Sequence, residues 1–172
     1  MRTPRLFGKL FLSALAAAAG VAFAAEELKN WFNDPFVQLS HAVAGCPEPR
    51  GPRMSAADRL SQSHHRAERG TTCWLRGECE RPNAYEYDAA IAEQIAAAWK
   101  QHPELQQSSI WLTVQGRIVF LDGCASRPGF AEDLERLGRS VPRVALVIAR
   151  VTASTAGRLP YPPFNPASAA AR

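Results

Sequence analysis

The sequence predicts an α+β fold: a domain of order α-β-β-α-β with two helices on one face of a three-stranded mixed sheet, preceded by an irregular, disulfide-tied N-terminal helical region. Three observations lead to this prediction. Apolar residues recur at helical spacing in two segments, they alternate in two short segments joined by a glycine turn, and four cysteines follow a segment typical of exported proteins. The predicted parts are residues 1–24, 25–87, 88–151 and 152–172.

Residues 1–24 have the three parts of a secretory signal peptide. Arg2, Arg5 and Lys9 make the start basic, residues 10–23 carry no charge, and Ala22-Phe23-Ala24 is a small-x-small cleavage site. A membrane anchor is the alternative, but the uncharged run is shorter than the roughly 20 residues that a spanning helix needs. We therefore expect cleavage near Ala25 and export to the periplasm, or beyond it into the medium.

Cleavage would remove most of the basic excess. Three of the 20 Lys and Arg residues lie in the signal segment, so 17 remain against 16 Asp and Glu, a formal net charge of +1. Nucleic-acid binding loses its main support, because such proteins carry a clear basic excess. The sequence contains no phosphate-binding loop, dinucleotide fingerprint or serine-nucleophile elbow, so we expect neither a small-molecule cofactor nor an enzyme.

Four cysteines remain after cleavage: Cys46, Cys73, Cys79 and Cys124. An even number in an exported chain favours two disulfides, and the three possible pairings are not distinguished by the sequence. We favour Cys73–Cys79, closing a tight hairpin with Gly77 in its turn, which leaves Cys46–Cys124. The alternative is a zinc-dependent or other secreted hydrolase that uses His64, His65 and the cysteines. The spacing of Cys73 and Cys79 is wider than that of typical zinc pairs, and adjacent histidines point to different sides of a helix.

Residues 25–87 are expected to contain two short helices separated by the proline-rich segment 46–52. Asn33-Asp34-Pro35 is typical of a helix start, and Phe36, Leu39 and Val43 follow it at helical spacing. The second helix is expected over residues 55–70, with a capping serine at its start and Gly70 at its exit. Residues 80–87 are expected to be an extended connector.

Residues 88–151 have the regular periodicity of a folded domain. Asp88 is expected to cap a helix with a stripe of Ile91, Ile95 and Trp99. Two strands, 109–114 and 117–121, should meet at a Gln115-Gly116 turn, with Asp122-Gly123 ending the second strand. A helix over 128–140 and a strand over 144–151 complete the order. Residues 152–172, rich in proline, are expected to be a disordered tail.

The alternating hairpin has two faces. Ile110, Leu112, Val114, Val119 and Leu121 should meet the helices. The other face holds Trp111, Thr113, Ile118 and Phe120, with Trp111 opposite Phe120, and is more apolar than a solvated face should be. We expect the N-terminal region, a partner or lipid to cover it. A second candidate surface consists of Arg136, Arg139 and Arg143, which can meet lipid phosphates or remain solvated beside neighbouring glutamates.

Residues 88–151 resemble a BON domain, a module of exported bacterial proteins. The matching stretches are the Ile91/Ile95 helix, Leu112-Thr113-Val114-Gln115-Gly116 leading into Val119-Phe120-Leu121-Asp122-Gly123, and the closing Val144-Ala145-Leu146-Val147-Ile148. Gly116 stands one residue earlier than in the usual pattern, and Cys124 replaces a common Thr. The cysteine-containing segment upstream resembles the one that precedes a BON domain in a group of proteobacterial envelope proteins. The resemblance implies a non-catalytic module that binds phospholipid surfaces or another envelope component.

Overall fold

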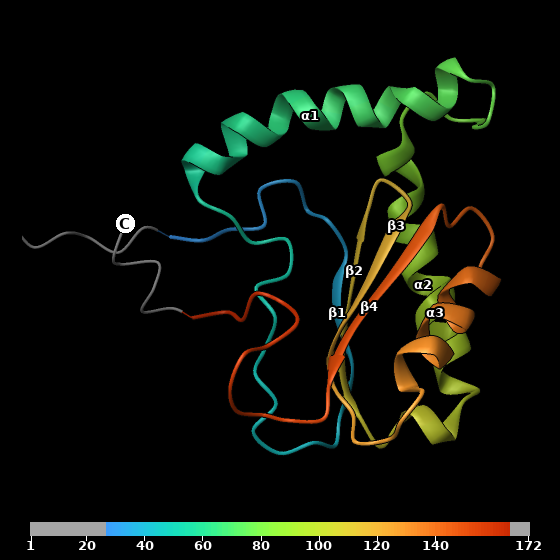
Figure 1. The fold of residues 1–172 in the computed structure, drawn as a ribbon. Helices are drawn as coiled ribbons and strands as arrows, with labels where there is room; N and C mark the ends of the chain where they lie inside the picture. Colours follow the sequence, from blue (N-terminus) through green and yellow to red (C-terminus); the bar gives the residue numbers. More distant parts are fainter. Residues whose placement is uncertain (1–26, 166–172) are drawn as a thin grey trace, which may run out of the picture.

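The computed structural model describes residues 27–165 and is built around a four-stranded sheet (Figure 1). The strands lie in the order β1, β2, β3, β4, and only β3 and β4 run parallel. Two helices, α2 and α3, cover one face, and the long helix α1 crosses above one end of the sheet (Figure 1). The strands are β1 (Phe36–His41), β2 (Ser109–Gln115), β3 (Ile118–Cys124) and β4 (Leu146–Thr152), and the helices are α1 (Ala56–Leu75), α2 (Asp88–Lys100) and α3 (Phe130–Ser140), with short 3-10 turns η1 (Ala84–Tyr87) and η2 (Pro103–Leu105).

The α+β class and the helix-covered face are as predicted from the sequence. Ile91, Ile95 and Trp99 of α2 and Leu134 of α3 are buried against the inward-facing residues of β2 and β3. Within residues 88–152 the order is α2-β2-β3-α3-β4, which is the predicted order. The predicted three-stranded sheet is wrong, because a fourth strand comes from the N-terminal region. The predicted signal peptide lies outside the described residues.

This fourth strand replaces the first predicted N-terminal helix. Residues Phe36–His41 form β1, which pairs antiparallel with β2 and has an irregularity between Gln38 and Ser40. Asp34, read from the sequence as a helix start, instead binds side chains far away in the chain. Without β1, the outer edge of β2 would leave backbone N–H and C=O groups unpaired. Pairing with these groups therefore explains why residues Phe36–His41 form a strand.

The β2–β3 turn lies one residue later than expected. Gln115 pairs with Ile118, so the turn residues are Gly116 and Arg117, with φ of 59° and 68°. Positive φ at both positions is the type I′ geometry that suits a two-residue hairpin. Thr113 consequently faces Phe120, and Trp111 faces Asp122, which corrects the predicted Trp111–Phe120 pair. The two faces are unchanged, because the register differs by an even number of residues.

The strand β3 also continues through Asp122 and Gly123, where a break was expected. Gly123 has φ of +154°, and a Cβ there would lie 1.9 Å from the Ser109 carbonyl oxygen. Glycine is required because the backbones of β2 and β3 approach so closely at this point. Continuation of the strand places Cys124 beside Cys46.

The segment after β4 is not a disordered tail as far as residue 165. Thr152 belongs to β4, and the following residues run across the sheet face opposite the helices (Figure 1). Tyr161 is buried and its Oη donates to the Pro47 carbonyl, while Arg50 N donates to the Pro162 carbonyl. The prediction of disorder is therefore wrong for residues 152–165, because prolines do not prevent burial of an aromatic anchor.

Both predicted disulfides are present. Cys46 joins Cys124 across a sequence separation of 78, and Cys73 joins Cys79 across a separation of 6. Disulfides of this kind indicate an oxidising compartment. Within residues 27–165, none of the helices has the length and apolar character that crossing a membrane requires.

Candidate functional site

The outer sheet face is covered by the chain itself. Trp111 is 8% exposed, and its strand neighbour across the β1–β2 ladder is Gln38. Ile118 and Phe120 are half-buried. The cover is the N-terminal region together with residues 153–165 (Figure 1). Of the three candidates named from the sequence, the N-terminal region thus provides part of the cover, and Trp111 is not available to a lipid or a partner in this structure.

The three predicted arginines do not form a free basic patch. Arg136 pairs with Asp133, Arg139 with Glu135 at 3.0 Å, and Arg143 with Glu80 at 2.7 Å. Each guanidinium is therefore opposed by a carboxylate, and exposed pairs of this kind contribute little energy. Only Arg143 lies in a larger cluster of functional interest, described below.

The residues of the zinc alternative are separated in the structure. All four cysteines are disulfide-bonded, so none is available as a thiolate ligand. His64 and His65 are exposed on α1 and each lies beside Glu68. Across residues 27–165, His, Cys, Asp and Glu side chains nowhere form a group of three or more that could hold a metal ion.

The helix α1 is an arm that projects along one end of the molecule and buries little of itself. Only Gly70 and Cys73 of its 20 residues are buried. The helix passes Gly70, where an exit was expected, because this glycine serves a close contact: a Cβ there would lie 2.6 Å from Asn83 Oδ1. The arm ends instead near Gly77, which has the positive φ typical of helix ends.

Arginines rather than apolar side chains hold the arm against the body. Arg66 stacks between the rings of Phe32 and Tyr85, with its Cζ 4.1 and 3.8 Å from their centroids. Its two terminal nitrogens bind both oxygens of the buried Asp34 at 2.9 and 2.6 Å. Gln115 also donates to Asp34, at 2.6 Å, which connects the arm to the end of β2. Planar guanidinium groups suit such combined stacking and bidentate pairing.

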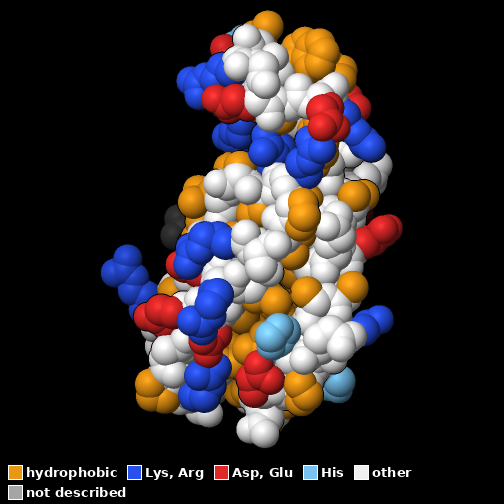
Figure 2. All heavy atoms as spheres, turned by 90° about the vertical axis from the view of Figure 1, so that its right-hand side faces the viewer, with side chains coloured by type: hydrophobic (Ala, Val, Ile, Leu, Met, Phe, Trp, Pro, Cys, Tyr) orange, Lys and Arg blue, Asp and Glu red, His pale blue; other side chains and the backbone are white. Residues whose placement is uncertain are grey.

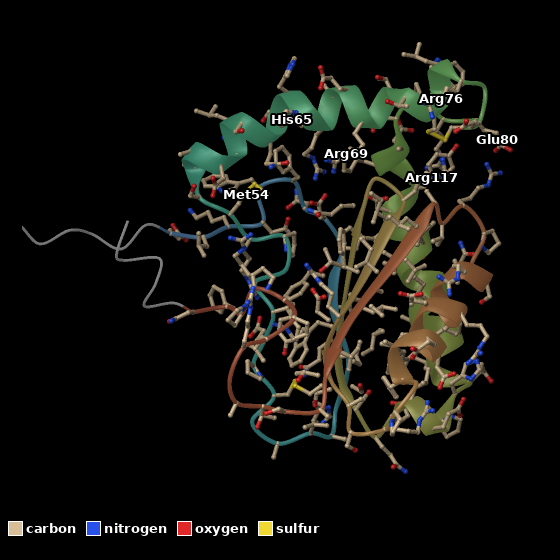
Figure 3. The ribbon with its side chains drawn as sticks, in the orientation of Figure 1. Met54, His65, Arg69, Arg76, Glu80 and Arg117 are labelled. Atoms are coloured by element: carbon tan, nitrogen blue, oxygen red, sulfur yellow. A yellow bond between two sulfur atoms is a disulfide. The ribbon has the colours of Figure 1, made fainter. Side chains whose placement is uncertain are left out.

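Tyr85 brings a polar hydroxyl group to this contact. Its hydroxyl is buried without a hydrogen-bond partner among residues 27–165. Burial raises the pKa of Tyr85, although the nearby cations Arg66 and Arg69 oppose the shift. Figure 3 shows Arg69 directed from α1 toward the body of the protein. The ring of Tyr85 also lies against Gly116, so the arm and the hairpin turn share one contact surface.

Beneath the far end of the arm, the hairpin turn is held by a buried carboxylate. Asp88 accepts hydrogen bonds from the Gly116 and Arg117 backbone N–H groups at 2.6 and 2.7 Å. Asp88 was predicted to cap its own helix, but it caps the turn instead. Burial raises the pKa of Asp88 to about 6 despite these two hydrogen bonds.

Arg117 connects this turn to the second disulfide. One of its terminal nitrogens lies 2.7 Å from Cys79 Sγ, and its Nε donates to the Arg143 carbonyl. Arg81, Arg117 and Arg143 all lie over the ring of Tyr87, between 5.3 and 5.7 Å from its centroid. Three cations thus surround one aromatic ring directly below the Cys73–Cys79 loop.

We call residues 73–79 the tip; it presents two large apolar side chains to solvent. Trp74 is 47% exposed and Leu75 is 78% exposed. Arg76 follows them, and no ion pair joins it to a carboxylate among the described residues. Figure 2 shows hydrophobic and charged side chains together at this end of the molecule, and Figure 3 places Arg76, Glu80 and Arg117 around the disulfide.

This surface is not among the binding surfaces predicted from the sequence. Residues 73–79 were expected to be a structural hairpin, and the predicted binding residues lie within 88–151. A signal was present, because Trp74-Leu75-Arg76 lies between two cysteines with no apolar pattern to bury it. Large apolar residues held at a surface by a short disulfide loop are more typical of binding than of packing.

No protein-family model, curated protein or solved structure matches this chain. The BON resemblance of residues 88–151 therefore stays a prediction from those residues.

Proposed function

We propose that this chain is a non-catalytic binding module of the bacterial cell envelope that contacts anionic phospholipid surfaces through the tip. The observation that carries the proposal is the exposure of Trp74 and Leu75 on a loop closed by Cys73–Cys79, beside Arg76, which forms no ion pair within residues 27–165. The BON resemblance and the predicted signal peptide support the same location and class of function.

The tip has the chemistry of a membrane interface. Tryptophan prefers the headgroup region because its ring is apolar and its N–H is polar. A leucine adds apolar area, and an arginine adds about 1 kcal/mol of attraction to an anionic surface. The tip and the contacts beneath it contain five arginines against four carboxylates, which favours an anionic partner: Arg69, Arg76, Arg81, Arg117 and Arg143 against Glu78, Glu80, Glu86 and Asp88.

Liposome co-sedimentation tests this proposal. The mature protein should sediment with vesicles that contain anionic phospholipid, less with neutral vesicles, and less again in about 1 M NaCl, where charges are screened beyond about 3 Å. The double variant Trp74→Ser with Leu75→Ser should abolish sedimentation, and Arg76→Gln should weaken binding to the anionic vesicles only.

Matched controls exist on the same chain. Leu60 is 75% exposed on the same helix but lies far from the tip in the sequence, so Leu60→Ser should bind like the wild type. Arg158 is exposed, and Arg158→Gln controls for loss of one positive charge. Equal loss in the tip variants and these controls, or no sedimentation of the wild type, would overturn the proposal. Retention of a protein partner by the wild type and its loss from the tip variants, without lipid binding, would assign the tip to a partner protein instead.

A further inference from the structure

A polar pocket lies on the sheet face opposite the helices, under the covering segments. It has a volume of about 180 Å³. Its floor comes from β2, β3 and β4, and its rim from residues 50–51 and Pro162, which are tied together by the hydrogen bond from Arg50 N to the Pro162 carbonyl. The lining residues are Arg50, Gly51, Thr113, Gln115, Phe120, Asp122, Arg150 and Pro162.

Two charged groups of the pocket already neutralise each other. Arg150 binds Asp122 through two nitrogens, Nε at 2.6 Å and a terminal nitrogen at 2.7 Å. The Asp122 side chain is 4% exposed, and burial raises its pKa in spite of Arg150. This pair forms a fixed polar wall that can still accept and donate hydrogen bonds, because neither group uses all its donors or acceptors.

The remaining charge is that of Arg50. Its side chain is exposed at the rim, and no ion pair joins it to a carboxylate among residues 27–165. Its backbone is held at Pro162, and the next residue, Gly51, has φ of +59° with the Phe36 ring where a Cβ would lie. The backbone of Arg50 is therefore held at the rim, and the positive charge of its side chain favours an anionic group on a ligand.

Thr113 provides a hydroxyl group inside the pocket. It is 4% exposed, it lines the cavity, and its hydroxyl forms no hydrogen bond with another described residue. Gln115 uses its amide nitrogen on Asp34, which leaves its carbonyl oxygen as an acceptor. Both atoms line the cavity and can be hydrated there, so a polar ligand can replace the water that would otherwise bind them.

We propose that this pocket binds a sugar acid of a single ring: a six-membered ring with several hydroxyl groups and one carboxylate. A cavity of about 150 Å³ holds a benzene molecule, so this pocket has room for the ring itself, while the substituents of the ring extend through its open rim beside Arg50. The carboxylate pairs with Arg50, and the hydroxyl groups bond to Thr113, Gln115 and the Asp122–Arg150 pair. Phe120 supplies an apolar wall for the C–H face of the ring.

Isothermal titration of the full chain with D-glucuronate and D-galacturonate tests the proposal. At least one should bind, D-glucose should bind at least about tenfold more weakly because it lacks the charge, and benzoate should not bind because it lacks the hydroxyls. Arg50→Gln should weaken binding of the acid about tenfold and bring it close to that of glucose. Thr113→Val, which keeps the shape and removes the hydroxyl, should weaken the acid and glucose alike.

The controls separate this pocket from the tip. Arg158→Gln and the Trp74→Ser, Leu75→Ser double variant should leave sugar-acid binding unchanged, and Arg50→Gln should leave liposome binding unchanged. No heat from either acid, equal binding of benzoate, or wild-type affinity in Arg50→Gln would overturn the proposal. Binding of inorganic phosphate as tight as that of the sugar acids would overturn it as well, because a plain oxyanion would then be sufficient.

Discussion

At one end of the molecule, Cys46–Cys124 joins the segment before the arm to the end of β3, and Tyr161 Oη lies 3.7 Å from both sulfur atoms. At the other end, Cys73–Cys79 closes a short loop whose residues Trp74 and Leu75 are exposed. Both bonds have the same chemistry. They differ in the length of chain that they close and in whether the residues beside them are buried.

This difference indicates that one disulfide stabilises the fold and the other holds the tip residues at the surface. The long-range bond restricts a large part of the unfolded chain and holds three segments that are distant in the sequence. The short bond restricts few residues and closes the loop that exposes Trp74 and Leu75. The disulfide that closes the long loop should thus dominate the free energy of unfolding, while the one that closes the short exposed loop should matter chiefly for binding.

The largest expected effect is loss of the long-range disulfide. Cys46→Ala with Cys124→Ala should lower the free energy of unfolding by about 4.5 kcal/mol, because a loop of this length gains that much entropy in the unfolded chain. Urea denaturation of the oxidised protein measures it. A loss no larger than that of the short disulfide would contradict the comparison.

The same residue type should behave differently at the two ends. Trp111→Ala should lower the free energy of unfolding by about 3 kcal/mol, since it empties a large buried site. Trp74→Ala should change it by no more than about 0.5 kcal/mol, because the side chain is half exposed. Thermal and urea unfolding of both variants checks this. Equal losses of unfolding free energy in the two variants would mean that Trp74 is packed against the body of the protein rather than exposed.

Loss of the short disulfide should be milder for stability. Cys73→Ala with Cys79→Ala should cost about 2 kcal/mol by the same entropy relation. Liposome sedimentation of this variant should nevertheless fall as far as that of the Trp74 and Leu75 variant. A folded variant that sediments like the wild type would show that the loop needs no closure to bind.

The smallest effect concerns the support of the tip and depends on pH. The pKa of Asp88 is about 6 in the folded protein, above its usual 3.8, so ionisation is less favourable in the folded than in the unfolded state. Its contribution is therefore most favourable below about pH 4 and is lost as the pH rises to about 6. The free energy of unfolding of the wild type, minus that of Asp88→Asn, should fall by about 1 to 2 kcal/mol between about pH 4 and pH 6, allowing for solvent screening.

Urea titrations of both proteins at a series of pH values measure this difference. A difference that stays constant from pH 4 to pH 6 would mean that Asp88 ionises as easily in the folded protein as in the unfolded chain.

The elements that the sequence predicted well are those with local causes. The stripes of α2 and α3, the alternation in β2 and β3, and the apolar β4 each follow from side-chain periodicity, and all five elements are present within a few residues of their expected ends. The even number of cysteines likewise predicted two disulfides, and the favoured pairing is confirmed.

The candidate site could not be predicted in the same way. One fact needed to predict it is that the arm continues past Gly70, which contacts Asn83. Another is that Arg136, Arg139 and Arg143 each pair with a carboxylate. Those facts concern residues that are apart in the sequence or paired on the surface. Periodicity carries no information about them.

The sequence by itself determined the α+β class, the inward face of the sheet and the presence of two disulfides, because each depends on repeating patterns or on cysteine number. Only the tertiary structure decided that Phe36–His41 is a strand, that Asp88 caps a turn instead of a helix, and that residues 153–165 cover the sheet. In each of these cases a backbone edge, a pair of N–H groups or an apolar face needed a partner, and the partner came from a distant part of the chain.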